Sequence, residues 1–255
     1  MASWNPAQYL KFAGHRLRPA LDLLASVEAD SPKTVFDLGC GPGNVTKLLA
    51  ERWPGARVTG IDDSPEMLAR AKKDMPTLDW QAADLRTWKP AAPADVLYSN
   101  AALHWLDGHE TLFPHLMKNV APGGVFAVQM PKNFHEPSHR GMFESAEAGP
   151  WKDKALAALR QFPMHDHGFY YDLLKPFAAD VDIWETVYVQ ALEGEDPVAE
   201  YTKGSSLKPA LDALAGEERE AFWADYKARI RKAYPKRADG RTLFPFRRLF
   251  IVART

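Results

Sequence analysis

The stretch VFDLGCGPGN, Val35–Asn44, decides the fold of this 255-residue chain. An apolar run ends at an acidic residue, Asp37, and leads into three alternating glycines, Gly39, Gly41 and Gly43. Glycine permits a positive φ and lets the backbone approach a ligand without a Cβ in the way. A helix that follows such a loop offers free N–H groups at its N-terminus. The stretch therefore predicts a buried strand, a ligand-binding loop and a helix.

Strand and helix patterns alternate on both sides of this loop. The strands predicted by short apolar runs are Lys33–Leu38, Arg57–Ile61, Leu78–Ala82, Asp95–Ser99, Val125–Met130, Val181–Ala191 and Phe246–Ala253. The helices predicted by periodicity and caps are Val45–Trp53, one that begins at Ser64-Pro65, and Thr111–Val120 before a turn at 121–124. Residues 132–175 have no clear period, whereas 196–234 are largely helical in pattern. Strands that alternate with helices indicate a parallel sheet covered on both faces.

Two nucleotide ligands compete for the glycine loop. The dinucleotide fingerprint is G-x-G-x-x-G, and Gly39 and Gly41 fit it, but the third glycine would fall on Asn44. Asp37 lies two residues before the first glycine. Its charge would repel a pyrophosphate and would suit the sulfonium and ammonium groups of S-adenosylmethionine. The loop favours S-adenosylmethionine over NAD, while a nucleoside-binding regulator without catalytic activity stays open.

Acidic residues also end the second predicted strand. In TGIDDSPEM, Asp62 follows the loop by about 20 residues, a position from which a carboxylate can accept both ribose hydroxyls of a nucleoside. Asp63 is the alternative, although its charge would equally suit the N-terminus of the next helix. Met67 is a candidate for packing on the adenine, although methionine at helical spacing is more often core.

The third and fourth strands add polar side chains at the same sheet edge. In AADLRTW, Asp84 can accept from the adenine amino group while Leu85 packs on the ring. In YSNAALHWL, Asn100 can meet the methionine end of the cofactor. His104 and Trp105 would then lie where a methyl acceptor binds.

Together, these four motifs resemble the motif series of class I S-adenosylmethionine-dependent methyltransferases. The segments WNPAQYLKF, VQMP and FRRLFIVAR are similar to segments of one family in that class, the trans-aconitate 2-methyltransferases, so the likeness runs from about Trp4 to Arg254. The resemblance implies an α/β three-layer sandwich with a Rossmann-like seven-stranded, mostly parallel sheet, one antiparallel strand and a helical lid. It implies cofactor roles for Asp37, Gly39, Gly41, Asp62, Asp84 and Asn100.

The expected organisation is a single methyltransferase domain over residues 1–255. Its core would comprise about 30–130 and 176–255, with lid insertions at about 131–175 and 194–244 and an N-terminal helical cover over 1–29. The implied reaction converts a carboxylate of trans-aconitate to a monomethyl ester, with S-adenosylhomocysteine as the second product. A carboxylate is already ionised at pH 7, so no catalytic acid or base is expected. Another small-molecule oxygen acceptor stays open.

A tricarboxylate acceptor requires cations around it, and arginine binds carboxylates bidentately. Arg16 and Arg18 are the first candidates, because an N-terminal segment can fold over the cofactor in this architecture. Tyr9 lies seven residues before Arg16, so it would share a helix face with it and could donate its hydroxyl. Further candidates are Lys203, Lys208, Arg247 and Arg248.

The composition of the chain indicates which kinds of partner are not expected. The net charge of −1 at pH 7 gives no reason to expect nucleic acid or an anionic membrane surface as a partner. No signal peptide is expected, and no apolar run approaches the roughly 20 residues of a membrane helix. The one cysteine, Cys40, excludes an intrachain disulfide and fits a cytoplasmic location. His165-Asp166-His167 lacks a third ligand at zinc spacing, so no metal is expected, and the oligomeric state is not indicated.

Overall fold

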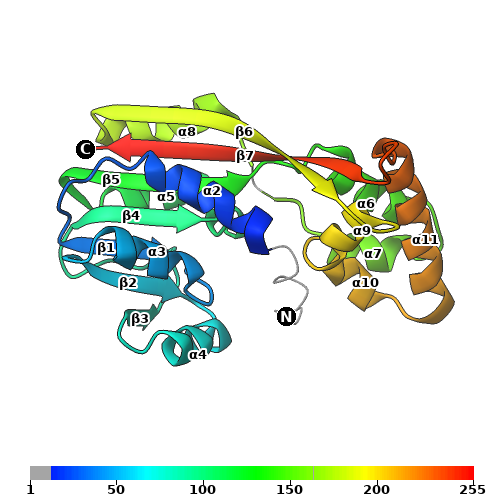
Figure 1. Cartoon of the computed structure of the whole chain (residues 1–255), viewed down its shortest axis with the longest axis horizontal. Coiled ribbons are helices and arrows are strands. Elements are labelled where there is room, and N and C mark those ends of the chain that lie inside the picture. The colour runs from blue at the N-terminus through cyan, green and yellow to red at the C-terminus, as the bar shows by residue number, and fades with distance from the viewer. Residues whose placement is uncertain (1–12, 163) are drawn as a thin grey trace. The chain divides into compact units, whose positions relative to one another are not determined.

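A computed structural model of the chain describes residues 13–162 and 164–255. The described chain forms two compact units (Figure 1). The sheet unit comprises residues 17–131, 164–186 and 248–255, and the helical unit comprises 132–162 and 187–247 together with 13–16. The predicted single domain, with its lid and cover boundaries, concerns how these units work together and stays a prediction.

The sheet has seven strands in the order β3-β2-β1-β4-β5-β7-β6. The strands are β1 (Thr34–Leu38), β2 (Arg57–Asp62), β3 (Asp79–Ala82), β4 (Ala94–Asn100), β5 (Val120–Pro131), β6 (Asp180–Leu192) and β7 (Thr242–Arg254). Every pairing among β1 to β5 is parallel, and β7 pairs antiparallel with β5. The predicted seven-stranded, mostly parallel sheet with an antiparallel strand is therefore confirmed.

Helices of the sheet unit follow the predicted alternation after the first, second and fourth strands, whereas residues His167–Leu174 are helical within a stretch for which no period was predicted. They are α2 (Ala13–Ala25), α3 (Asn44–Arg52), α4 (Pro65–Asp74), α5 (His109–Met117) and α8 (His167–Leu174), with short 3-10 turns η1 (Leu103–Trp105) and η2 (Lys175–Phe177). The predicted start of α4 is confirmed, because the Ser64 hydroxyl accepts the N–H of Met67 at 3.3 Å and Pro65 is the first helical residue.

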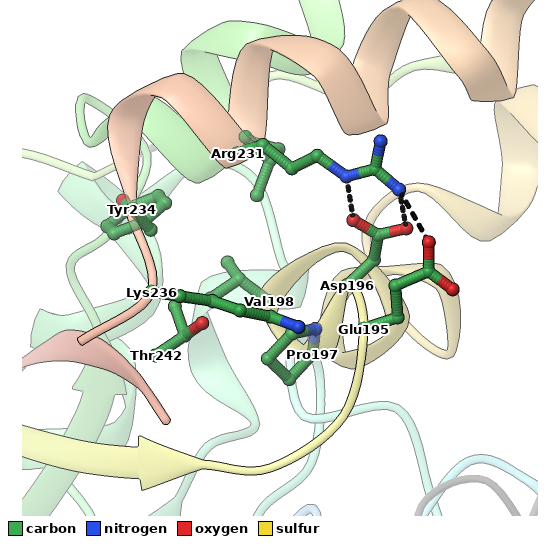
Figure 2. A pocket seen from close by; sticks show the side chains of 9 residues that line it. Glu195, Asp196, Pro197, Val198, Arg231, Tyr234, Lys236 and Thr242 are labelled. Atoms are coloured by element: carbon green, nitrogen blue, oxygen red, sulfur yellow. Dashed lines mark hydrogen bonds and ion pairs between the residues drawn. The ribbon is translucent and has the colours of Figure 1, made fainter. Parts of the chain in front are cut away.

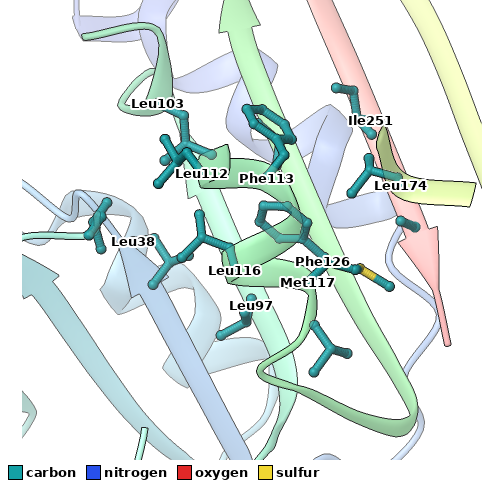
Figure 3. Close-up of a cluster of buried hydrophobic side chains, with 14 of the residues drawn as sticks. Leu38, Leu97, Leu103, Leu112, Phe113, Leu116, Met117, Phe126, Leu174 and Ile251 are labelled. Atoms are coloured by element: carbon teal, nitrogen blue, oxygen red, sulfur yellow. The ribbon is translucent and has the colours of Figure 1, made fainter. Parts of the chain in front are cut away.

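Side chains that alternate along the strands supply both faces of the sheet. On one face, Leu97 packs in a core with Phe113 and Leu116 of α5 and with Leu174 of α8 (Figure 3). On the other face, the buried hydroxyl of Tyr98 donates to the backbone carbonyl of Ala20 in α2. Helices therefore cover both faces, and the sheet unit is the predicted three-layer sandwich.

The start of β5 differs from the prediction. Residues 121–124, predicted as a turn, lie within the strand, and α5 ends at Met117 rather than at Val120. Ala94 of β4 pairs with Val120, but Val96 pairs with Val125, so β5 carries extra residues that shift the register. A Pro-Gly-Gly sequence interrupts the apolar pattern, and only the pairing with β4 reveals that the strand continues through it.

The helical unit contains elements that periodicity did not reveal. Its helices are α6 (Pro137–Glu147), α7 (Lys152–Ala158), α9 (Pro197–Lys203), α10 (Lys208–Ala213) and α11 (Gly216–Ala233). Buried aromatic residues, including Trp151, Phe222 and Phe244, form a separate hydrophobic core in this unit. The last three helices confirm the helical pattern of 196–234. No helix between residues 13 and 255, apart from the undescribed position 163, has the length and apolar character of a membrane span.

Candidate functional site

The glycine loop after β1 is held by the end of β2. The backbone N–H groups of Gly39 and Cys40 both donate to the carbonyl of Ile61, at 2.8 and 2.9 Å. Gly39, Gly41 and Gly43 have φ angles of +73°, +55° and +83°, which other residues rarely adopt. The predicted need for glycine at these positions is therefore met by the observed backbone.

The glycines at 39 and 41 serve different purposes. A Cβ on Gly39 would lie 2.2 Å from the Cβ of Ala102, which follows β4. A Cβ on Gly41 would meet no atom within 4 Å in the part of the chain that the structure describes. Ala101, beside Ala102, has a φ of +54° although it is not glycine, and such strained residues concentrate at functional sites. Gly39 thus brings two loops into contact, while no described residue fills the space beside Gly41.

Asp62 connects the loops after β1 and β2. One carboxylate oxygen accepts the N–H of Gly41 at 2.8 Å, and the other accepts the N–H of Ser64 at 2.9 Å. Burial raises the pKa of Asp62 above its ordinary value, and these two hydrogen bonds oppose the rise. An ionised carboxylate has about four lone-pair sites, so both oxygens retain capacity for further donors. Neighbouring Asp63 is exposed.

Asp37 is buried inside the protein. Its side chain is 1% exposed, and it accepts the hydroxyl of Thr46 on α3 at 2.6 Å. Burial raises the pKa of Asp37 to about 7, and the charge of Asp62 adds to the rise while the Thr46 hydrogen bond opposes it. Direct contact between Asp37 and a cofactor stays a prediction.

The remaining predicted cofactor residues lie after β2 and β3. Met67, in the first turn of α4, is half-buried, and Leu85 is buried. The carboxylate of Asp84 accepts the Nε of Arg86 at 2.9 and 3.0 Å, which holds the pKa of Asp84 below its usual range. Arg86 is therefore a neighbour that any ligand at Asp84 would meet.

Asn100 ends β4 with an unsatisfied acceptor. Its Oδ1 is buried and has no hydrogen-bond partner among the described residues. His104 and Trp105 follow in η1 with ring centroids 5.0 Å apart, His104 buried and Trp105 42% exposed. A buried acceptor without a donor costs about 1–3 kcal/mol, so a ligand that donates to Asn100 would relieve this cost.

Two of the predicted acceptor cations approach carboxylates of their own neighbourhood. Arg18 is 72% exposed and its Nε lies 3.8 Å from a carboxylate oxygen of Asp22. The Nε of Arg247 lies 3.4 Å from an oxygen of Glu136. Tyr9 falls outside the described residues, and the Arg16 side chain is likewise not described.

Lys208 lines a small cavity of the helical unit. It forms an ion pair with Asp212, and the cavity has a volume of about 180 Å³. The lining comprises Glu200, Lys203, Gly204, Lys208, Leu211, Asp212 and Arg219. Three basic and two acidic side chains meet there, so part of the positive charge is already neutralised.

A second cavity of the helical unit, of about 360 Å³, contains none of the predicted site residues. Figure 2 shows Arg231 on its wall, with the guanidinium bound to the carboxylates of Asp196 and Glu195. Apolar side chains such as Val198 and Ile230 also line the cavity, together with Lys236. The acidic and basic groups on this wall largely neutralise one another.

Three residues of the sheet unit escaped the sequence prediction. Thr46 is the hydrogen-bond partner of Asp37. The ring of Trp80 fills the space beside Gly43 and Gly60, where a Cβ would lie 2.4 and 2.5 Å from ring atoms. Glycine inside a strand often marks such a close approach, so Gly60 was the available signal. Gln129 at the end of β5, the third residue, is a polar side chain in an apolar run.

Two other kinds of chemistry, a nucleophilic cysteine and a metal site, would involve Cys40 and the histidines at 165 and 167. Burial raises the pKa of the Cys40 thiol, which keeps it protonated and unreactive. His167 pairs with Glu185 at 2.8 Å, and the His165 ring stacks on Phe169. Among the residues that the structure describes, no three His, Cys, Asp or Glu side chains are grouped as a metal site.

The comparisons with known proteins agree with this geometry. Residues 35–124 match the family model for a methyltransferase domain. The chain is 50% identical over 253 residues to a trans-aconitate 2-methyltransferase of Azoarcus sp. (strain BH72), covering 99% of each chain. It is 49% identical over 260 residues to a trans-aconitate 2-methyltransferase of Streptomyces avermitilis, covering 98% of this chain and 96% of the relative. The crystal structure of the YcgJ protein from Bacillus subtilis shares the fold, with a TM-score of 0.60 and 12% identity over 93% of this chain and 98% of that chain.

Proposed function

The chain belongs to the trans-aconitate 2-methyltransferase family, and we propose that it transfers the methyl group of S-adenosylmethionine to a carboxylate of trans-aconitate. The products are a monomethyl ester and S-adenosylhomocysteine. The observation that carries the proposal is identity near 50% along almost the whole chain, which includes both units rather than the nucleotide loop alone. The acceptor is therefore a small carboxylic acid rather than a macromolecule.

The sheet edge supports binding of the cofactor. When bound, S-adenosylmethionine supplies an activated methyl group on a positively charged sulfur. Asp62 would hold the ribose hydroxyls, because both its oxygens retain lone pairs beside the loop. Gly41 leaves room for the ligand, and Asn100 offers a buried acceptor that suits an ammonium group. These three features fit a nucleoside that carries an amino acid.

Transfer to a carboxylate needs little acid–base chemistry from the protein. An acceptor carboxylate is already ionised at pH 7, so we assign no catalytic acid or base. The residues around the site act by alignment and by exclusion of water, which can contribute about 7–11 kcal/mol to lowering a barrier. The single-domain organisation, with the helical unit as a lid, and a cytoplasmic location belong to the same proposal.

A methyl-transfer assay tests the proposed function. The purified chain, supplied with S-adenosylmethionine carrying a labelled methyl group, is offered trans-aconitate and a panel of other di- and tricarboxylates. We expect trans-aconitate to give the highest kcat/KM and a base-labile ester product. Transfer to a neutral oxygen acceptor with none to any carboxylate would refute the substrate and leave only the methyltransferase assignment.

Replacing Asp62 should weaken cofactor binding selectively. Asp62→Ala removes a charged acceptor from the ribose and frees the N–H groups of Gly41 and Ser64. Hydrogen bonds to charged groups contribute about 1.5–3 kcal/mol, so the Kd for S-adenosylhomocysteine should rise roughly 10- to 100-fold. Calorimetry measures the change, and circular dichroism confirms that the variant is folded.

The neighbouring carboxylate supplies the control. Asp63 is exposed, so Asp63→Ala should leave the Kd within about twofold of the wild-type value, since surface substitutions usually change free energies by less than about 0.5 kcal/mol. The opposite pattern, with a loss only in the Asp63 variant, would assign the ribose to Asp63.

A further inference from the structure

Three polar side chains of the sheet unit share one face and one edge of the sheet. Asn100 of β4 pairs with Gln129 of β5, and Arg248 of β7 pairs with Pro131, two residues beyond Gln129 on the same strand. Side chains two positions apart on a strand share a face, and diagonal cross-strand neighbours remain within reach of long side chains. These residues thus form one polar group, called here the Asn100–Gln129–Arg248 group.

The group is buried. Gln129 is 0% exposed, Arg248 is 5% exposed, and the Nη1 of Arg248 lies 3.4 Å from the Oε1 of Gln129. A guanidinium can only donate hydrogen bonds, so the Gln129 atom that faces it must be the oxygen. The amide Nε2 therefore points elsewhere, and it is buried with no hydrogen-bond partner among the described residues.

The donors of the group define what it can bind. A guanidinium and an amide NH₂ both donate hydrogen bonds, and together they complement an anion with two oxygens. Burial of these groups strengthens their attraction to such an anion, because water does not screen it. The chemistry that fits is a carboxylate.

The order of strands separates two members of this group, Gln129 and Arg248, from the nucleoside. The residues assigned to the cofactor follow β3, β2, β1 and β4, which are adjacent in that order. Gln129 and Arg248 lie on the next two strands, β5 and β7. Neighbouring strands are about 4.8 Å apart, so β7 lies roughly 14 Å from β1. A ligand that extends past Asn100 reaches this group next.

We propose that Arg248 and Gln129 form the binding site for a carboxylate of the methyl acceptor that is not the one methylated. The inference rests on the proposed function, because trans-aconitate supplies such a carboxylate. It favours Arg248 over the adjacent Arg247, whose side chain is 44% exposed and approaches Glu136. The amino-acid carboxylate of the cofactor has the same chemistry and is the alternative source.

Two variants test the site in different ways. Arg248→Met removes the guanidinium and keeps an apolar chain of similar length. Gln129→Glu keeps a hydrogen-bond acceptor beside Arg248, which supports the fold, but it removes the amide donor and places a carboxylate where the ligand's carboxylate would bind. Arg254→Met is the matched control, because Arg254 lies on the same strand opposite Val125, at the other end of β5.

Calorimetry measures S-adenosylhomocysteine binding to each protein, and then trans-aconitate binding to each protein saturated with S-adenosylhomocysteine. We expect Arg248→Met and Gln129→Glu to weaken trans-aconitate binding roughly 30- to 1000-fold, the usual loss when one partner of a desolvated pair is removed. Affinity for S-adenosylhomocysteine should stay within about threefold, and Arg254→Met should resemble wild type in both titrations. KM for trans-aconitate should rise in parallel with the loss of binding.

Three other results would contradict the proposed carboxylate site or the proposed function. A loss of S-adenosylhomocysteine affinity with unchanged trans-aconitate binding would assign the carboxylate to the cofactor and overturn the acceptor site. Folded variants that bind both ligands as wild type does would overturn the inference while leaving the proposed function intact. If wild type neither binds nor methylates trans-aconitate, the proposed function fails, and the variants are then compared on whichever carboxylate of the panel wild type binds. An unchanged affinity for that acid would overturn the inference separately.

Discussion

Asp37→Asn is expected to stabilise the ligand-free protein at pH 8. The wild-type carboxylate is ionised at that pH although it is buried, and burial has raised its pKa from 3.8 to about 7. A tenfold change in an acid dissociation constant corresponds to about 1.4 kcal/mol, so the ionised group destabilises the fold by roughly 2–4 kcal/mol. Asparagine has the same shape, carries no charge and still accepts from Thr46. The thermal midpoint should rise by roughly 5–15 °C.

The pH dependence gives this prediction its sign. The native state binds the Asp37 proton more tightly than the unfolded state, so the contribution of Asp37 to stability is lost as pH rises from about 4 to 7. The difference between the variant and wild type should therefore be small near pH 4 and largest above pH 7. His139, whose pKa burial lowers to about 4, is common to both proteins and cancels in the difference. A difference that does not vary with pH would contradict the assigned cause.

The same substitution separates stability from function. If Asp37 attracts the ammonium group of the cofactor, which S-adenosylhomocysteine retains, Asp37→Asn should bind S-adenosylhomocysteine more weakly while being more stable. Calorimetry on the two proteins at pH 8 measures this. A variant that is both more stable and equal to wild type in cofactor affinity would limit Asp37 to a role in supporting the loop through Thr46.

Gly39→Ala should mainly lower the stability of the protein, whereas Gly41→Ala should mainly lower its affinity for the cofactor. Gly39→Ala places a Cβ 2.2 Å from the Cβ of Ala102 at a φ of +73°, so the loops after β1 and β4 must separate. Overpacking costs about 1–3 kcal/mol, and the left-handed backbone adds about 1–2 kcal/mol. We expect the free energy of unfolding to fall by roughly 2–5 kcal/mol, measured by denaturant titration.

Gly41→Ala should destabilise the protein less than Gly39→Ala does. Its Cβ meets no atom of the described residues within 4 Å, so the backbone cost of about 1–2 kcal/mol is the one that applies. The added methyl would instead occupy space assigned to the cofactor, and a clash of about 1–3 kcal/mol corresponds to a loss of affinity of roughly 5- to 150-fold. If Gly41→Ala unfolded the protein or bound S-adenosylhomocysteine normally, Gly41 would not face the ligand.

Local chemistry explains which parts of the fold the sequence could predict. Glycines that adopt positive φ, a serine cap before Pro65 and short apolar runs are signals carried by neighbouring residues. They predicted the first five strands, the two late strands and the start of α4. The helices α6 and α7 were missed because such short helices take their stability from tertiary packing rather than from periodicity along the chain.

For the candidate site too, the sequence determined some features and the tertiary structure determined the others. The sequence by itself determined which residue types follow each strand: the glycine loop, Asp62, Asp84 and Asn100. Only the tertiary structure decided where each side chain points, because burial and hydrogen bonding depend on residues distant in the chain. Asp37 faces Thr46 inside the protein rather than the loop surface.

The pairing of β7 with β5 distinguishes Arg247 from Arg248. The sequence offers the adjacent Arg247 and Arg248 as candidates and favours Arg247. β7 returns antiparallel beside β5, and alternation along the strand exposes Arg247 while it buries Arg248 near Gln129, a partner 119 positions away in the chain. The sequence thus determined the residue types and the order of the strands' motifs, whereas strand pairing decided which arginine is buried at the carboxyl edge of the sheet.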